Sequence, residues 1–229
     1  MNTTNKIALI IPAGGMGSRF EYNKPKQFYK LNGRELIILT IQNLQSIYNF
    51  ESIIIPCKSD WVDFMNELLS EYDIEDCVVI DGGETRSKSV LLGLDKINNA
   101  KYVLIHDAVR PFVTKNLINK LINKLQTEMA VIPVIPITDT IKVLKPDNSI
   151  DSTADREKLF AAQTPQAFEV QLLKEANNYI SNQNINPTDD ASIVENYGFN
   201  VQTVVGEINN IKITTKEDLL KAEIIINRK

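Results

Sequence analysis

Histidine and cysteine are scarce in this sequence, whose 229 residues include one histidine and two cysteines. Cys57 and Cys77 form no Cys-x-x-Cys pair, and no cluster of histidines accompanies them, so we expect no structural zinc. Two scattered cysteines are typical of a reducing compartment and not of a disulfide scaffold. These shortages predict a protein of the reducing cytoplasm.

Long apolar runs and an excess of positive charge are also missing. The first apolar run, residues 7–11, is too short for the core of a secretion signal or for a membrane span. The formal net charge is −4 at pH 7, so no broad basic field attracts nucleic acid or an anionic membrane. We therefore expect a cytoplasmic protein that binds neither, and any phosphate chemistry must depend on a few placed cations and a metal ion.

Short apolar segments alternate with amphipathic ones along the chain. This pattern is typical of a parallel sheet covered on both faces, and right-handed crossovers would make it a doubly wound α/β fold. We expect one domain over residues 1–229. The predicted strands are 7–12, 52–56, 77–80, 102–106 and 130–135, and the predicted helices are 35–48, 61–72 with Asp60 as N-cap, 87–97 and 116–125.

The alternation is interrupted at residues 137–154, where partial β alternation flanks a Pro-Asp-Asn turn at 146–148. This pattern predicts a β-hairpin rather than a crossover helix, and so an arm over approximately 137–156. After the arm, the sequence predicts helices at 172–180, 191–197 and 216–226, and strands at 200–205 and 211–214.

A glycine-rich segment, Ala13-Gly14-Gly15-Met16-Gly17-Ser18-Arg19, follows the first predicted strand. Open α/β sheets bind ligands beyond the carboxyl ends of their strands, and glycines let backbone N–H groups approach phosphate oxygens. A dinucleotide fingerprint would need glycine at Phe20, and the Gly-Lys-Ser/Thr of a Walker loop is missing. A tight turn without a ligand remains the alternative.

Two cations near this segment favour a triphosphate site. Arg19 ends the loop, and Lys26 follows within Lys24-Pro25-Lys26-Gln27, where Pro25 restrains the chain. A fixed Arg and Lys suit a transfer reaction in which charge grows on the α-phosphate, with Mg²⁺ bridging the triphosphate. Solvated surface cations are the alternative interpretation.

The Ala-Gly-Gly-x-Gly-x-Arg and Pro-Lys-Gln motifs together resemble the signature of the cytidylyltransferases that make CDP-methylerythritol or CDP-ribitol. The resemblance extends through motifs in matching order from about Ile7 to about Glu223. It implies a Rossmann-like nucleotidyltransferase fold that joins CTP to a small sugar- or polyol-phosphate and releases pyrophosphate. It also implies a homodimer with shared active sites, in which the hairpin arm reaches across to the neighbouring subunit.

The choice of acceptor is left open between two branches of this family. The segments 89–90, 161–168 and 188–195 favour methylerythritol phosphate and hence isoprenoid precursor synthesis, and we prefer this branch. Val109, Phe112 and the Gly14-Gly15 pair favour ribitol 5-phosphate. A catalytically silent nucleotide-binding regulator is a third hypothesis, which intact Arg19 and Lys26 argue against.

The resemblance implies roles for residues in each motif, while the metal ligands stay unknown. Asp107 at the end of a strand could hold magnesium or accept hydroxyls of the acceptor, and the lone His106 is expected to be structural. Lys212 is flanked by apolar residues, so the sequence does not settle whether it faces a ligand or water. The implied residues are Arg19 and Lys26 for catalysis, Ala13, Gly14, Gly15, Gly83, Glu84, Ser89 and Arg110 for the nucleotide, and Asp107, Thr140, Arg156 and Lys212 for the acceptor.

Overall fold

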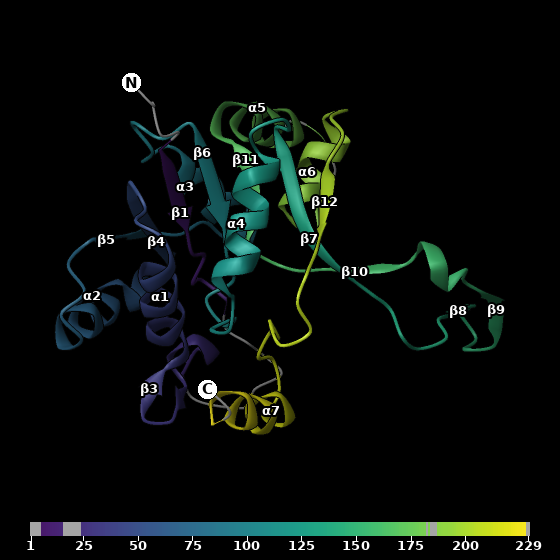
Figure 1. The fold of residues 1–229 in the computed structure, drawn as a ribbon, viewed down its shortest axis with the longest axis horizontal. Coiled ribbons are helices and arrows are strands. Elements are labelled where there is room, and N and C mark those ends of the chain that lie inside the picture. Colours follow the sequence, from purple (N-terminus) through teal and green to yellow (C-terminus); the bar gives the residue numbers. More distant parts are fainter. Residues whose placement is uncertain (1–5, 16–23, 182, 184–186, 228–229) are drawn as a thin grey trace.

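The computed structural model describes residues 6–15, 24–181, 183 and 187–227. It shows a central sheet with helices on both faces and a hairpin that extends away from it (Figure 1). The strands of the sheet are β1 (Ile7–Ile10), β4 (Ser52–Cys57), β5 (Cys77–Asp81), β6 (Tyr102–Ile105), β7 (Ala130–Pro136), β10 (Phe160–Ala162), β11 (Gln166–Glu169) and β12 (Gln202–Val205). The α-helices are α1 (Leu36–Ile47), α2 (Val62–Glu71), α3 (Arg86–Leu94), α4 (Lys115–Lys124), α5 (Val170–Ser181), α6 (Asp190–Asn196) and α7 (Lys216–Ile226). Within these ranges no helix is long and apolar enough to cross a membrane.

The order of the strands determines where a ligand can bind. Neighbouring strands follow the order β10-β7-β11-β6-β1-β4-β5, and β12 pairs with β7. From β1 the chain moves outward through β4 to β5, and it then returns to the other side of β1 as β6, all in parallel. The order therefore reverses between β1 and β6, and ligands of open α/β sheets bind beyond the strands at such a reversal. The predicted doubly wound, mostly parallel sheet is confirmed.

The alternation of side chains along β1 assigns the helices to two faces. Ile7 and Leu9 belong to the apolar cluster covered by α1, α2 and α4, whereas Ala8 and Ile10 belong to that covered by α3, α5 and α6. All four side chains are buried, which explains why this strand is apolar throughout. With both faces covered, the carboxyl ends of β1 and β6 are left for a binding site.

The predicted hairpin is present. β8 (Lys142–Leu144) and β9 (Ile150–Thr153) pair antiparallel and stand apart from the sheet (Figure 1). Asn148 in the turn has φ 65°, a left-handed conformation that asparagine tolerates. Several large apolar side chains on the hairpin and at its base are exposed, namely Ile141, Val143, Leu144, Ile150 and Phe160.

Some local predictions are wrong. Residues 211–214 form no strand; Ile213 makes one backbone hydrogen bond to the Val109 carbonyl at 3.0 Å, and its side chain is buried beside α7. Asp60 does not cap α2, because it lies inside the 3-10 helix η3 (Ser59–Trp61) and Trp61 occupies the N-cap position. The pattern also gave no signal for β10 and β11, which pair antiparallel with β7.

Candidate active site

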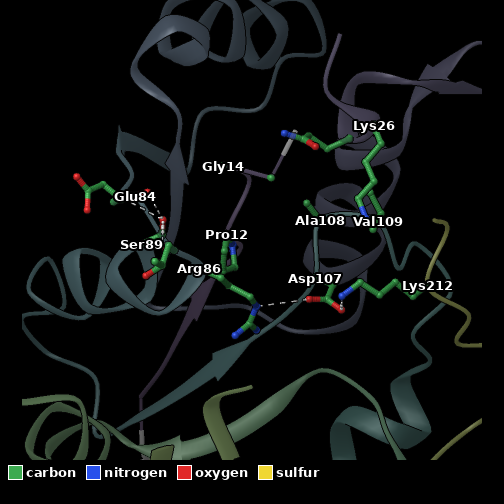
Figure 2. A pocket seen from close by; sticks show the side chains of 14 residues that line it. Pro12, Gly14, Lys26, Glu84, Arg86, Ser89, Asp107, Ala108, Val109 and Lys212 are labelled. Atoms are coloured by element: carbon green, nitrogen blue, oxygen red, sulfur yellow. Dashed lines mark hydrogen bonds and ion pairs between the residues drawn. The ribbon is translucent and has the colours of Figure 1, made fainter. Parts of the chain in front are cut away.

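A cavity of about 210 Å³ opens at the carboxyl ends of β1 and β6, where the strand order reverses (Figure 2). Its walls are the glycine loop after β1, the segment around the 3-10 helix η2 (Lys26–Phe28), the loop between β5 and α3, and the loop after β6. The predicted residues that line it are Gly14, Gly15, Lys26, Gly83, Glu84, Ser89, Asp107 and Lys212. Residues from motifs far apart in the sequence therefore share one cavity.

The glycine loop leaves space that none of the described residues fills. A Cβ added to Gly15 would meet no described atom within 4 Å, and one added to Gly14 would meet only Ser89 Oγ at 3.8 Å. Gly83 differs, because a Cβ there would collide with Lys88 at the start of α3. Packing of α3 thus requires glycine at position 83, whereas the open space beside Gly14 and Gly15 is suited to an approaching ligand.

Lys26 enters the cavity from a well-anchored segment. Pro25 occupies the N-cap position of η2. Phe28 is fully buried, and its ring centroid lies 5.3 Å from that of Trp61 and 5.0 Å from that of Phe64. In Figure 2 the Lys26 side chain extends toward the loop that follows β6. This placement favours a ligand-facing lysine over one that is only solvated.

Three cations converge on the Asp107 carboxylate. Lys212 Nζ and Arg110 Nε lie 3.0 and 3.1 Å from its Oδ2, and Arg86 Nε lies 3.9 Å from its Oδ1. Figure 2 shows Arg86 and Lys212 approaching from opposite sides. Burial alone would raise the pKa of Asp107, but the three cations outweigh it and hold the pKa well below its usual range. Lys212 therefore faces the cavity, and Asp107 is ionised.

His106 is a satisfied structural residue, in agreement with the sequence prediction. Its Nε2 lies 3.0 Å from the Arg110 carbonyl oxygen, so this nitrogen carries the proton and donates. Nδ1 then accepts from the Thr164 hydroxyl at 3.1 Å, and Thr164 Oγ1 accepts from the Asp107 N–H at 3.0 Å. Burial lowers the pKa of His106 to about 4. The neutral imidazole thus fixes the backbone on both sides of Asp107.

A second cavity of about 290 Å³ adjoins the first. The two share Arg86, Asp107 and Lys212 as a common wall. Arg110 lines the second cavity and not the first, although the resemblance placed it beside the nucleotide. The other lining residues are Ala162, Gln163, Thr164, Gln166, Thr188 and Asp189. Two small polar molecules could therefore meet at one cationic wall.

Arg86 is a site residue to which the sequence assigned no role. It begins α3 and bridges two carboxylates, since its Nη1 lies 2.7 Å from Asp190 Oδ2 while its Nε faces Asp107. Asp190 is 0% exposed, and burial raises its pKa against the effect of Arg86. The neighbouring Asp189 caps α6 by accepting from the Ser192 N–H. Nothing in the local sequence connects Asp190 to Arg86.

Ser89 and Glu84 have local partners in addition to their place beside the cavity. The Ser89 hydroxyl donates to the Thr85 carbonyl at 2.9 Å and accepts from the Gly83 N–H at 3.0 Å, so it shapes the loop. The Glu84 carboxylate is exposed and lies 2.9 Å from Lys88 Nζ, which lowers its pKa. Their contacts with a nucleotide base stay predictions.

Three of the predicted residues that the structure describes line neither cavity, namely Ala13, Thr140 and Arg156. Ala13 is buried, and Arg19 lies outside the described residues. Thr140 and Arg156 are exposed on the arm, where Arg156 Nη1 donates to the Thr138 carbonyl at 2.8 Å. If the two arm residues serve a site of this kind, they serve that of another copy.

All residues that line the two cavities lie within one family match. Residues 7–228 match the model of the 2-C-methyl-D-erythritol 4-phosphate cytidylyltransferase family. The chain belongs to this family. A relative of that name from Clostridioides difficile (strain 630) is 39% identical over 222 residues, which cover 96% of this chain and 93% of the relative. The crystal structure of 4-diphosphocytidyl-2C-methyl-D-erythritol synthase from Anaerococcus prevotii DSM 20548 is 32% identical with a TM-score of 0.85, covering 98% of this chain and 97% of that one.

The family's fold is equally clear in a further solved member. The Francisella tularensis 2-C-methyl-D-erythritol 4-phosphate cytidylyltransferase is 34% identical with a TM-score of 0.81 over 96% of this chain and 99% of its own. Family membership makes the protein a CTP-dependent nucleotidyltransferase, and its match includes both cavities and the arm.

Proposed function

We propose that the protein transfers the cytidylyl group of CTP to 2-C-methyl-D-erythritol 4-phosphate and releases pyrophosphate. The supporting observation is the pair of adjoining cavities whose shared wall carries Arg86, Asp107 and Lys212. One cavity has an open glycine loop and a lysine, as a triphosphate needs, and the other has cations and hydroxyl partners, as a polyol phosphate needs.

In this proposal the first cavity holds CTP. Gly14 and Gly15 present backbone N–H groups to the phosphates, the buried Ala13 holds the loop in place through its N–H bond to Pro56, and Gly83, Glu84 and Ser89 lie beside the base and ribose. Lys26, with Arg19, neutralises the charge that grows on the α-phosphate during transfer. The lysine segment is held by buried Phe28, so its charge is in place before the reaction begins.

The second cavity holds the acceptor. Lys212 and Arg110 bind its phosphate, and the ionised Asp107 accepts hydrogen bonds from its hydroxyl groups. An acceptor phosphate is already ionised at neutral pH, so its oxygen can attack the α-phosphorus in line without a strong general base. The new bond joins that oxygen to the α-phosphorus, and pyrophosphate leaves with the electrons of the broken bond.

Magnesium fits this site as a companion of the nucleotide. Among the described residues, no group of three or more His, Cys, Asp or Glu side chains could hold a metal ion. Asp107 is already engaged by three cations. Because Mg²⁺ keeps several waters and binds substrate phosphates with few protein ligands, we propose that the triphosphate holds it. When bound, it would supply charge neutralisation of the phosphates.

We further propose a homodimer in which each arm completes the partner's acceptor site through Thr140 and Arg156. The arm stands apart from the sheet with exposed apolar side chains (Figure 1). An isolated two-stranded hairpin is only marginally stable in water, and such apolar surface favours a partner. Arg suits the role because its planar fork binds phosphate through two hydrogen bonds.

The proposal is tested by measuring pyrophosphate release from CTP with 2-C-methyl-D-erythritol 4-phosphate and with ribitol 5-phosphate side by side. We expect faster turnover of the methylerythritol acceptor, and CTP used at least roughly tenfold better than UTP or ATP. Faster turnover of ribitol 5-phosphate would assign the acceptor suggested by Val109 instead. CTP binding without pyrophosphate release on either acceptor would favour a regulator.

A further inference from the structure

The buried Gln27 side chain connects the lysine segment to the glycine loop. It is 3% exposed, and its Nε2–H donates a hydrogen bond to the Ala13 carbonyl oxygen. Ala13 is buried and donates its own N–H to the Pro56 carbonyl at 2.8 Å. Since Gln27 directly follows Lys26 in η2, one side chain joins two walls of the first cavity.

This hydrogen bond fixes the orientation of a peptide plane. The Ala13 C=O and the Gly14 N–H belong to the same trans peptide, so they point in opposite directions. With the oxygen held by Gln27, the Gly14 N–H points away from Gln27. Among the described residues this N–H has no hydrogen-bond acceptor, and Gly14 lines the cavity. An N–H in this situation is a donor for a phosphate oxygen.

We propose that Gln27 is a positioning residue for cytidylyl transfer, which orients the Gly14 N–H and sets its spacing from Lys26. The inference rests on the proposed use of CTP in the first cavity. One N–H of the Gln27 amide is used by the Ala13 carbonyl, and through this bond Gln27 acts on the loop beside it. Phe28 already anchors the segment by its burial against Trp61 and Phe64. The amide therefore contributes the orientation of the Ala13–Gly14 peptide, which an apolar side chain of the same size would not fix.

The test replaces Gln27 by Met, which has nearly the same length but no N–H group. The Gln27→Met variant should bind CTP roughly tenfold more weakly and have a kcat about tenfold lower, because the Gly14 N–H and Lys26 are no longer held in fixed positions relative to each other. Cytidine contains the base and ribose but no phosphate, so its inhibition constant should be unchanged. Thermal unfolding monitors the fold of every variant.

Asn43→Leu is the matched control. Asn43 Nδ2 donates to the Val113 carbonyl at 2.7 Å, so this variant also loses an amide-to-backbone hydrogen bond without a change in size. Asn43 lines neither cavity. The control should lose stability to a similar degree while its kcat and CTP affinity match those of the wild type.

Gln27→Glu supplies a second, pH-dependent measurement. A carboxylate cannot donate to the Ala13 oxygen, whereas a protonated carboxyl group can, and burial raises the pKa of a carboxyl group. The kcat of this variant relative to wild type should therefore rise several-fold as the pH falls from about 8 to 6. A merely structural role would not produce this recovery.

Wild-type kcat and CTP affinity in Gln27→Met would overturn the inference, as would equal losses for CTP and cytidine. A flat ratio of Gln27→Glu to wild-type kcat across this pH range would also contradict it. Lack of turnover by the wild type would instead count against the proposed function. In that case the comparison of CTP with cytidine binding still decides the role of Gln27.

Discussion

Asp107→Asn is the substitution that most directly probes the cationic wall. Removing the negative charge leaves Lys212, Arg110 and Arg86 facing one another. The three ion pairs of these side chains with Asp107, at 3.0, 3.1 and 3.9 Å, are lost. Breaking a buried ion pair from one side costs about 3–5 kcal/mol. Lys212 and Arg86 are 41% and 33% exposed, so solvent screening places the expected loss of unfolding free energy near the lower limit, about 3 kcal/mol. For a chain of this length that lowers Tm by about 6–12 °C.

The same substitution should strengthen binding of anions. The Asp107 charge opposes a phosphate in the second cavity, and removal of a like charge at about 5 Å is worth about 1–3 kcal/mol for effective dielectric constants between 80 and 20. Inorganic phosphate should therefore bind the Asp107→Asn variant roughly tenfold more tightly than the wild type. Turnover should fall, because the acceptor hydroxyls exchange a charged hydrogen-bond acceptor with two oxygens for a neutral one with a single oxygen.

Thermal unfolding at increasing phosphate concentrations measures both effects together. We expect a lower Tm without phosphate and a larger rise of Tm with phosphate for the variant than for the wild type. Glu51→Gln is the control: it breaks the Lys6–Glu51 pair, which is as short at 2.7 Å but exposed, and should cost less than about 1 kcal/mol. An unchanged Tm, or a variant that phosphate stabilises less than it does the wild type, would refute the reasoning about this wall.

Three further predictions concern Lys26, Arg156 and His106. Lys26→Ala should lower kcat by on the order of 100-fold while CTP still binds. A near-normal kcat would mean that Lys26 is only a solvated surface cation. Lys26→Ala and Arg156→Ala chains refolded as an equal mixture should regain roughly a quarter of wild-type activity. Random pairing makes half of the dimers mixed, and each mixed dimer has one site of two with both residues intact. A mixture that stays inactive would argue against shared sites. Burial lowers the pKa of His106 from 6.5 to about 4. Between these pH values the unfolded chain binds a proton that the folded chain does not, so the free energy of unfolding should decrease as the pH falls from about 6.5 to 4. Because His106 is the single histidine, its ring NMR signals should not shift between about pH 7.5 and 5, and a midpoint near 6.5 would contradict its burial.

The sequence predicted the fold where burial alone decides structure. β1 is apolar throughout because both of its faces are covered, so its sequence indicates a buried parallel strand. The same reasoning failed at residues 211–214, where Ile213 is buried but the backbone pairs with no strand in the part of the chain that the structure describes. Alternation reports which side chains are buried, and it does not report whether a backbone is paired. The short strands β10 and β11 depend on pairing with β7 and β6, which lie earlier in the chain.

The candidate site was predictable where a motif follows a strand and not where long-range contacts form it. The glycine loop follows β1 and Asp107 follows β6 at the reversal of strand order, and both line one cavity together with Lys26 from η2. Arg86 belongs to the site through Asp190, to which no local pattern connects it. Gln27 was visible as part of a motif, but its hydrogen bond to Ala13 depends on how two loops fold together.

Phosphorus NMR of a reaction with CTP and 2-C-methyl-D-erythritol 4-phosphate tests the central claim most directly. We expect the phosphomonoester signal of the acceptor to disappear and a coupled pair of diphosphate signals to appear, together with pyrophosphate in equal amount. Formation of CMP with an unchanged acceptor signal would mean hydrolysis instead of transfer. That result, or no consumption of CTP with this acceptor, would contradict the proposed union of two substrates at the shared cationic wall.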